Sequence, residues 1–429
     1  MRPIDYIRKT HGFASQAPSS KALSSAPDIV DGMWAGQRCF IVGGGPTLKG
    51  FDWSRLKGEL TIGINRAFEK FDPTIIFSMD TRFHDWLMQG KWGAEVKKRF
   101  LEYPGIRLWA TKEPANIFDN GVQTIPCSLG GTSTFTASVR HGLFGQRNSG
   151  YAALNLAILL GCNPIYLLGF DMRGNGQGKQ KWYHDGYPVV TGENVYRNFA
   201  NSFRHAAPDA KKLSRIVLLT DSVLEDVFER QSIDDVPTIE RPIYASYATK
   251  GEYEADLTRL RRSLVRLGLE HHLEVVPDSG SWAKNCAKKP EFLLSVLQAN
   301  PGRSVVWVDA DAQILRYPAT LTGHQTGDLR VHYRDRGNGR TELLSGTVFV
   351  NGRSRVAAEA LTAWAARCRK NPSVWDQRTL AEVLTEMPGV NVDPLPAEYC
   401  CIFDKMAAEA PEPVIEHYQA SRRMRQKAG

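Results

Sequence analysis

Short, uninterrupted apolar runs that alternate with helical segments limit the fold of this chain more than any other feature. Strands that are buried on both faces appear as continuous apolar runs, and their alternation with helices is typical of parallel sheets. The sequence therefore predicts an α/β fold. The expected strands are Arg38–Val42, Leu60–Ile64, Thr74–Ser78, Pro164–Phe170 and Arg215–Thr220 in the first half, and Ile243–Tyr247, Leu273–Val276 and Ser304–Val308 in the second.

The length of the chain indicates two domains, because 429 residues exceed what one hydrophobic core usually holds. Residues 1–30 are rich in Ser, Ala, Pro and Lys without periodicity, and we expect a flexible leader there. The polar segment 231–242 carries two prolines and is the expected linker. The prediction is two Rossmann-like domains, over residues 31–230 and 243–429.

The charge of the chain is compatible with several partners. A net charge of +8 would suit a nucleotide diphosphate or a nucleic-acid surface equally well. The basic residues are dispersed, however, and dense basic runs with interleaved aromatic residues are absent. We therefore expect no nucleic-acid partner. The sequence leaves the oligomeric state open.

The cysteines and the N-terminus bear on the cellular compartment. The seven cysteines show neither CxxC nor Cys/His spacing, so a reducing cytoplasm is the expected location. The N-terminus lacks the apolar core of a signal peptide. Tyr151–Phe170 is almost long and apolar enough for a membrane span, but Asn155 and the turn 161–164 interrupt it. We expect a buried helix, a turn and a buried strand, and no integral membrane span.

Two carboxylates follow the expected strand at 304–308, in the tripeptide Asp309-Ala310-Asp311. Open α/β sheets bind ligands at the carboxyl ends of their strands. Two carboxylates one residue apart can both face a divalent cation, which would bridge the phosphates of a nucleotide diphosphate. The same tripeptide also occurs by chance in exposed turns and helix caps. Its position after four apolar residues favours the metal site.

A helix is expected from about residue 252 to 267, with apolar residues at helical spacing on one face. Its arginines lie largely elsewhere, and we expect them to form a solvated face. The apolar residues are Tyr253, Leu257, Leu260, Leu264 and Leu267, and the arginines are Arg259, Arg261, Arg262 and Arg266.

Residues 241–425 resemble nucleotide-diphospho-sugar transferases of the GT-A fold, because several motifs occur together in the order of that family. This resemblance implies a GT-A-like C-terminal domain that transfers a sugar from a nucleotide-sugar donor to a glycan or other hydroxyl acceptor with Mn²⁺ or Mg²⁺. The motifs are Trp282–Phe292, VVWVDADAQI around Asp309, Ser345–Asn351, Trp375-Asp376-Gln377 and Glu416–Arg422.

The resemblance implies roles for individual residues. Asp309 and Asp311 would hold the metal, His417 would complete its coordination, and Arg422 would contact the diphosphate. A surface position is the alternative for His417.

Two further segments match the family. Asp376 and Gln377 would face the sugar or the acceptor, and Asp376 is the candidate general base of an inverting reaction. Asp376 would also be a good cap for a helix at 377–384, and the two roles are compatible. For Lys288 and Lys289 we favour a helix entrance over phosphate contacts.

A glycine-rich turn, Gly43-Gly44-Gly45, follows the first strand. Backbone N–H groups there could bind a phosphate, although the motif is neither GxGxxG nor a Walker loop, and a plain tight turn explains it equally well. Residues 37–222 resemble 6-hydroxymethylpterin pyrophosphokinase-like and motility-accessory-factor-like domains. The motifs that carry this resemblance are the glycine-rich turn, Asn65, Ser149-Gly150, the end of the strand at 164–170 and Trp182–Asp185. Residues 37–222 are also similar to bacterial CMP-sialic acid transferases.

This second resemblance implies a sialyltransferase-like N-terminal domain. The three glycines, Asn65, Ser149 and Gly150 would line a second, metal-independent nucleotide-sugar site. His184 would be its candidate general base, since imidazole accepts a proton near neutral pH; alternatively it is an ordinary histidine of an aromatic loop.

The leading hypothesis is a glycosyltransferase centred on the acidic pair, with a second nucleotide-sugar site that would make the protein bifunctional. One alternative is a nucleotidyl- or pyrophosphoryl-transferase centred on the glycine-rich domain. Another is a non-enzymatic module that binds a glycan or a nucleotide.

Overall fold

The computed structural model describes residues 28–112, 121–129, 134–173, 192–251 and 253–420. The chain divides into two compact units, Met1–Pro237 and Thr238–Gly429. The division lies within the segment 231–242, and Val236 in this segment packs into the core of the first unit. Both units are α/β, and the first contains a large parallel sheet.

The first unit is built on a nine-stranded sheet in the order β6-β5-β4-β3-β2-β1-β7-β8-β9, with parallel pairing throughout. The five strands expected in this half are confirmed. The strand order reverses beside β1, which leaves a crevice at the carboxyl ends of β1 and β7. The strands are β1 (Cys39–Val42), β2 (Leu60–Ile64), β3 (Ile75–Ser78), β4 (Ile106–Thr111), β5 (Gln123–Ser128), β6 (Leu143–Phe144), β7 (Ile165–Leu168), β8 (Ile216–Leu218) and β9 (Glu229–Arg230).

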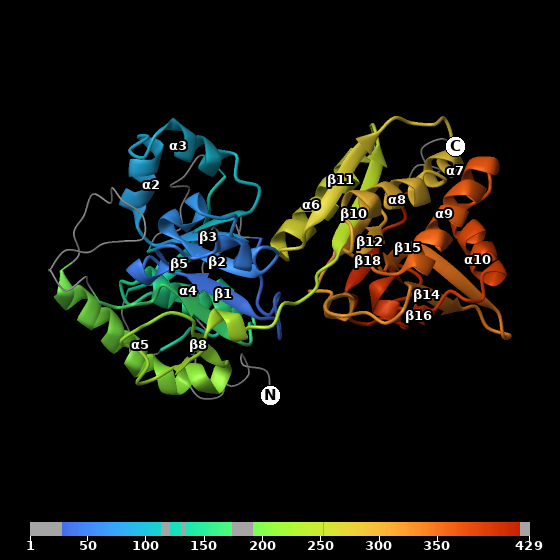
Figure 1. Ribbon diagram of the computed structural model, residues 1–429. Coiled ribbons are helices and arrows are strands. Elements are labelled where there is room, and N and C mark those ends of the chain that lie inside the picture. Colours follow the sequence, from blue (N-terminus) through green and yellow to red (C-terminus); the bar gives the residue numbers. More distant parts are fainter. Residues whose placement is uncertain (1–27, 113–120, 130–133, 174–191, 252, 421–429) are drawn as a thin grey trace. The chain divides into compact units, whose positions relative to one another are not determined.

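Helices cover both faces of this sheet (Figure 1). The helices α2 (Thr81–Met88) and α3 (Ala94–Leu101) pack on one face through a cluster that includes Phe83, Phe100 and Trp109. On the other face lies α4 (Ser149–Leu159), and α5 (Glu193–Leu213) packs against α4.

The apolar stretch Tyr151–Phe170 forms the buried helix α4, a turn and the buried strand β7, as expected. The interrupting residue Asn155 is fully buried, and its Oδ1 accepts hydrogen bonds from the backbone N–H of Phe144 at 2.8 Å and of Thr136 at 3.5 Å. Asn155 therefore ties α4 to β6 and to the segment before it. Among the described residues, none of the helices combines the length and the apolar character that a membrane crossing requires.

The second unit contains a six-stranded sheet in the order β11-β10-β12-β15-β14-β16. Its three expected strands are confirmed, and β10 pairs in parallel with both β11 and β12. The sheet is mixed, because β15 runs antiparallel to β12 and β14. The strands are β10 (Ile243–Thr249), β11 (His271–Val276), β12 (Val305–Val308), β14 (Leu329–Asp335), β15 (Thr341–Val350) and β16 (Val392–Pro394); a separate small sheet holds β13 (Ala312–Ile314), β17 (Cys401–Ile402) and β18 (Ile415–His417).

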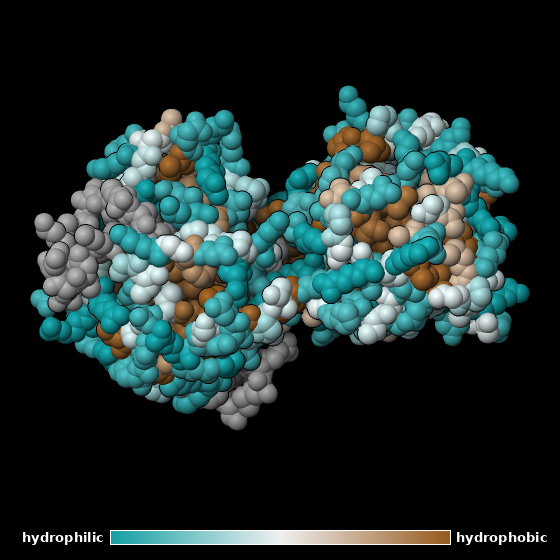
Figure 2. Space-filling view, in the orientation of Figure 1, coloured by the Kyte–Doolittle hydropathy of each residue, from teal (hydrophilic) through white to brown (hydrophobic). Residues whose placement is uncertain are grey.

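The core of the second unit lies between this sheet and three helices, α8 (Lys289–Ala299), α9 (Arg355–Lys370) and α10 (Asp376–Glu386). A short helix, α7 (Trp282–Cys286), precedes α8. Figure 2 shows hydrophobic residues on this side of the unit, between α8 and α9.

The helix α6 (Glu254–Arg266) packs against β10, β11 and β13, with Leu257, Leu260 and Leu264 buried as expected. The expectation that its arginines form a solvated face is wrong for two of them. Arg259 donates to the backbone carbonyl of Asp311, and Arg266 donates to the carbonyls of Ile314 and Leu315. Long arginine side chains reach inward past the apolar face to satisfy these carbonyls.

Replacing Asn155 with Leu should destabilise the first unit by about 1–3 kcal/mol, because the partly buried N–H of Phe144 would lose its acceptor and Leu has no polar atom to replace it. Urea unfolding would measure the change, and amide exchange at Phe144 should become faster. Asn198→Leu is the matched control, because Asn198 is exposed on α5; its effect should stay within about 0.5 kcal/mol. Equal effects of the two substitutions would contradict the structural role of Asn155.

Candidate functional site

The turn after β12 carries Asp309 and Asp311 at the carboxyl end of a central strand, between β10 and β15. The N–H of Asp309 donates to the carbonyl of Gly346 at 2.9 Å, which continues the pairing of β12 with β15. The N–H of Ala312 donates to the carbonyl of Asp309 at 3.0 Å and closes the turn into β13. The acidic pair therefore lies on a turn that is fixed on both sides.

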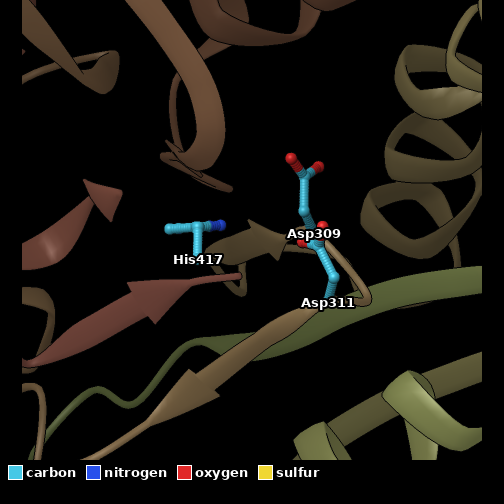
Figure 3. Close-up of side chains that lie close together, drawn as sticks. All are labelled: Asp309, Asp311 and His417. Atoms are coloured by element: carbon cyan, nitrogen blue, oxygen red, sulfur yellow. The ribbon is translucent and has the colours of Figure 1, made fainter. Parts of the chain in front are cut away.

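His417 reaches this turn from the end of β18. The strands β13 and β18 pair in antiparallel register, which places His417 opposite Ala312. One ligand atom from each of Asp309, Asp311 and His417 lies within 4.8 Å of the others, and Figure 3 shows the imidazole beside the two carboxylates. The alternative of a surface position for His417 is wrong, because this residue is only 4% exposed.

The segment after His417 holds Asp311 in place. The N–H of Ala420 donates to Asp311 Oδ2 at 2.6 Å, and the N–H of Tyr418 donates to its carbonyl at 3.2 Å. Arg259 Nη2 donates to the same carbonyl at 3.2 Å, and its guanidinium lies 4.8 Å from the centre of the Tyr418 ring. Arg259 is a residue of the site that the helical pattern did not reveal.

The two carboxylates differ in their surroundings. Asp309 Oδ1 accepts from Trp307 Nε1 at 2.7 Å and lies 3.0 Å from Lys289 Nζ. Burial, followed by repulsion from Asp309, raises the pKa of Asp311 to about 6. Burial lowers the pKa of His417 to about 4. At neutral pH the imidazole is therefore uncharged and Asp311 is mostly ionised.

Lys289 is a buried residue at the centre of this cluster. Its ammonium lies 3.0 Å from Asp309 Oδ1 and 2.9 Å from Asp376 Oδ2, and it donates to the carbonyl of Ser345 at 3.1 Å. Burial alone would lower the pKa of Lys289, but Asp309 and Asp376 raise it above its usual range. The expected role as a mere helix entrance is therefore incomplete, because Lys289 also joins α8 to the site.

Helical spacing carried a signal for Lys289. It shares a buried face of α8 with Leu293, Val296 and Leu297, at intervals of four, seven and eight residues. A lysine on such a face has to meet a negative charge, because an unpaired buried ammonium is strongly unfavourable.

Asp376 and Gln377 both bind Ser345, in the strand β15. Asp376 Oδ2 accepts from Ser345 Oγ at 3.0 Å, and Gln377 Oε1 accepts from Ser345 N at 3.3 Å. The helix-cap role expected for Asp376 is wrong: Trp375 is the N-cap residue of α10, and Lys289 binds the carboxylate of Asp376. With 1% exposure, Asp376 positions Lys289 in this arrangement, and its role as a general base stays a prediction.

Gly346 keeps the space between the candidate ligands open. A Cβ at this position would lie 2.9 Å from Cε1 and 3.1 Å from Nδ1 of His417, and 3.4 Å from Asp309 Oδ2. Any larger residue would therefore displace the imidazole or the carboxylate.

The donor atoms fit a divalent cation. His417 Nε2 lies 3.0 Å from Thr347 Oγ1, whereas the buried Nδ1 has no hydrogen-bond partner among the described residues. If Thr347 accepts the Nε2 proton, the Nδ1 lone pair is free to bind a metal, a common arrangement for ligating histidines. Two carboxylates and a neutral imidazole are ligands that Mn²⁺ accepts readily, and Mg²⁺ less so.

A second candidate site lies in the first unit, at the carboxyl ends of β1, β2, β3 and β7. It is a pocket of about 420 Å³. Three lining residues with a side chain, Asn65, Arg147 and Met172, have left-handed backbone, with φ of 52°, 56° and 52°. Such strained conformations concentrate at binding sites. The lining includes all six residues that we expected at a nucleotide site here, Gly43, Gly44, Gly45, Asn65, Ser149 and Gly150.

Two of these glycines also have a packing role. A Cβ on Gly45 would lie 2.1 Å from Asp171 Oδ1, and one on Gly43 would lie 2.7 Å from the carbonyl oxygen of Gly169. The loop after β1 can therefore approach the loop after β7 only with glycine at these positions, so the tight turn accounts for part of the motif. Two candidate residues, His184 of this pocket and Arg422 of the acidic site in the second unit, lie outside the described residues.

Replacing Lys289 with Met should destabilise the second unit by about 3–5 kcal/mol, because the carboxylate of Asp376 would remain buried without its counter-charge. Lys288→Met is the control: Lys288 Nζ donates to the exposed Pro277 carbonyl, and the change should stay within about 0.5 kcal/mol.

A double-mutant cycle in urea unfolding, with Lys289→Met and Asp376→Asn, should show a coupling of at least about 1 kcal/mol. If the two changes in the free energy of unfolding were strictly additive, the direct ion pair between Lys289 and Asp376 would be contradicted.

Comparisons with known proteins found only remote structural likenesses among the matches described below. No protein-family model and no curated protein matches the chain. A glycosyltransferase involved in the glycosylation of the major capsid of PBCV-1 is similar over 44% of this chain and 100% of its own, with 13% identity and a TM-score of 0.35.

The glycosyltransferase GlyE of Streptococcus pneumoniae TIGR4 is similar over 42% of this chain and 54% of its own, with 14% identity and a TM-score of 0.30. Its apo form gives 12% identity and a TM-score of 0.31 over the same shares. This chain thus spans about half the length of GlyE. These likenesses are remote, so the activity has to be inferred from the site itself.

Proposed function

We propose that the second unit is a glycosyltransferase that moves a sugar from a nucleoside-diphosphate donor to a hydroxyl group of a glycan or another acceptor. The observation that carries this proposal is the cluster of Asp309, Asp311 and His417 at the end of a central strand. It combines two carboxylates with a buried imidazole nitrogen that has no other partner among the described residues.

Asp309, Asp311 and His417 would hold Mn²⁺ or Mg²⁺. When bound, the cation supplies positive charge to the diphosphate as the donor sugar departs. Asp309 is suited to this role because Trp307 and Lys289 both bind its Oδ1, while its Oδ2 lies on the side of Gly346 and His417. Its orientation is therefore set before any ligand arrives.

The other residues of the cluster prepare the site. Lys289 fixes the carboxylates of Asp309 and Asp376 relative to one another, and Ser345 links Asp376 to the strand β15. Arg259 and the N–H of Ala420 hold the turn at Asp311. A site held rigidly in this way loses little free energy to reorganisation when charge develops on the leaving group.

The pocket of the first unit supports a second nucleotide-sugar site as an additional activity. Its place at the strand-order reversal is where open α/β sheets bind nucleotides. Arg82, Arg147 and Arg173 also line it and could pair with a phosphate. The same features fit the alternative of a nucleotidyl- or pyrophosphoryl-transferase centred on this pocket. If the protein were instead a non-enzymatic binding module, neither site would turn over a donor.

The activity of the Asp311→Asn variant tests the proposal. Mn²⁺-dependent hydrolysis of nucleotide sugars without acceptor, and transfer with acceptor, should fall on the order of 10²-fold or more. The fold should survive, because burial and Asp309 already disfavour the ionised carboxylate. Asp335→Asn is the control, because Asp335 is exposed at the end of β14.

The alternatives predict other outcomes. Turnover that survives Asp311→Asn but is lost in Asn65→Ala would move the chemistry to the first unit. Binding of nucleotide sugars by the wild-type protein without any turnover would favour the non-enzymatic module.

A further inference from the structure

Two tryptophans of the second unit are exposed beside the candidate site. Trp282 is 39% exposed and Trp375 is 44% exposed, and their ring centroids lie 6.0 Å apart at an interplanar angle of 53°. Two other tryptophans of this unit, Trp307 and Trp364, are buried at 2% and 1% exposure. Packing in the core therefore accounts for Trp307 and Trp364 but not for the exposure of Trp282 and Trp375.

The pair is continuous with the site through a short chain of contacts. Trp375 directly precedes Asp376, whose carboxylate lies 2.9 Å from Lys289 Nζ, and Lys289 lies 3.0 Å from Asp309 Oδ1. Trp375 is 44% exposed, whereas the next residue, Asp376, is only 1% exposed. Trp375 therefore lies where the buried cluster meets the surface.

The backbone under both rings is held firmly. Ser281 Oγ caps α7 by accepting from the N–H of Lys284 at 3.3 Å, and Tyr247 Oη donates to the carbonyl of Asn285 at 2.6 Å. On the other side, the N–H of Thr379 donates to the carbonyl of Trp375 at 3.1 Å. The two rings are thus presented by anchored elements, and little order has to be gained when a ligand stacks on them.

Polar residues lie near Trp282, whereas the exposed Val374 precedes Trp375. Asn285 Nδ2 donates to Asp278 Oδ1 at 2.7 Å, and Asp278, Ser281 and Lys284 are exposed. A pyranose ring has an apolar face of C–H groups and an edge of hydroxyl groups. Aromatic rings suit that face, and short carboxylate, hydroxyl and ammonium groups suit that edge. A long apolar peptide face would instead require a continuous apolar surface around the rings.

We propose that Trp282 and Trp375 form a stacking platform for a saccharide acceptor, beside the site of the donor. This inference rests on the glycosyltransferase function proposed above and names the class of its acceptor. The platform would hold a sugar ring of the acceptor by its apolar face and determine which glycan reaches the reacting centre.

The test compares Trp282→Ala and Trp375→Ala with the full-length wild-type protein on an array of immobilised oligosaccharides. We expect the wild-type protein to bind at least one oligosaccharide, and each variant to bind it with an affinity roughly tenfold lower or weaker still. Trp375→Phe should retain most of the binding, because it keeps an aromatic face. The matched control is Tyr333→Ala, since Tyr333 is 40% exposed on β14 and should not affect binding.

A second measurement separates this inference from the proposed function. Mn²⁺-dependent hydrolysis of UDP- and GDP-sugars without acceptor should stay within about twofold in both alanine variants, while the KM for the acceptor rises roughly tenfold. Unchanged acceptor KM and array binding in both variants would overturn the platform, as would a raised KM for the nucleotide sugar alone. No donor hydrolysis by the wild-type protein would overturn the proposed function, and tryptophan-dependent binding on the array would still support the platform.

Discussion

The buried ion-pair network around Lys289 is the interaction on which the second unit depends. One ammonium binds the carboxylate of Asp309, the carboxylate of Asp376 and the carbonyl of Ser345, and so connects α8, the turn after β12, α10 and β15. Its three N–H donors are all used in this way. Burying these charges is favourable only while every partner is present, so the network requires all four elements to meet in one arrangement.

The charges of this network are compatible with the proposed cation. Asp309, Asp311 and Asp376 together carry three negative charges when ionised, and Lys289 carries one positive charge, which leaves a formal charge of −2. One divalent cation would neutralise it. The raised pKa of Asp311 expresses the same imbalance, because burial and the neighbouring charge of Asp309 both disfavour its ionised form.

The sequence predicted the parts of the fold that depend on local pattern. Continuous apolar runs predicted β1, β2, β3, β7 and β8 of the first unit and β10, β11 and β12 of the second, but not β4, β5, β6 and β9. The acidic pair directly after β12 was also predicted at a strand end. The closeness of His417 could be expected only from the family resemblance, because the pairing of β13 with β18 joins distant segments. The antiparallel strands β14 and β15 were not predicted, because their residues do not form continuous apolar runs.

Side-chain roles were harder to predict where two interactions compete. An aspartate at a helix start usually caps it, but Asp376 binds the buried Lys289 instead, because a buried ammonium without a counter-charge is far less favourable than an uncapped N–H group. Arg259 belongs to a helix whose pattern predicted a solvated face, yet its length lets it reach the carbonyl of Asp311.

A crystal of the full-length protein grown with Mn²⁺ and examined by anomalous scattering would test the account most directly. If these three residues bind the metal, one peak should lie within about 2.0–2.4 Å of a carboxylate oxygen of Asp309, a carboxylate oxygen of Asp311 and Nδ1 of His417. A peak bound elsewhere, or an ordered site without manganese at saturating concentration, would contradict it.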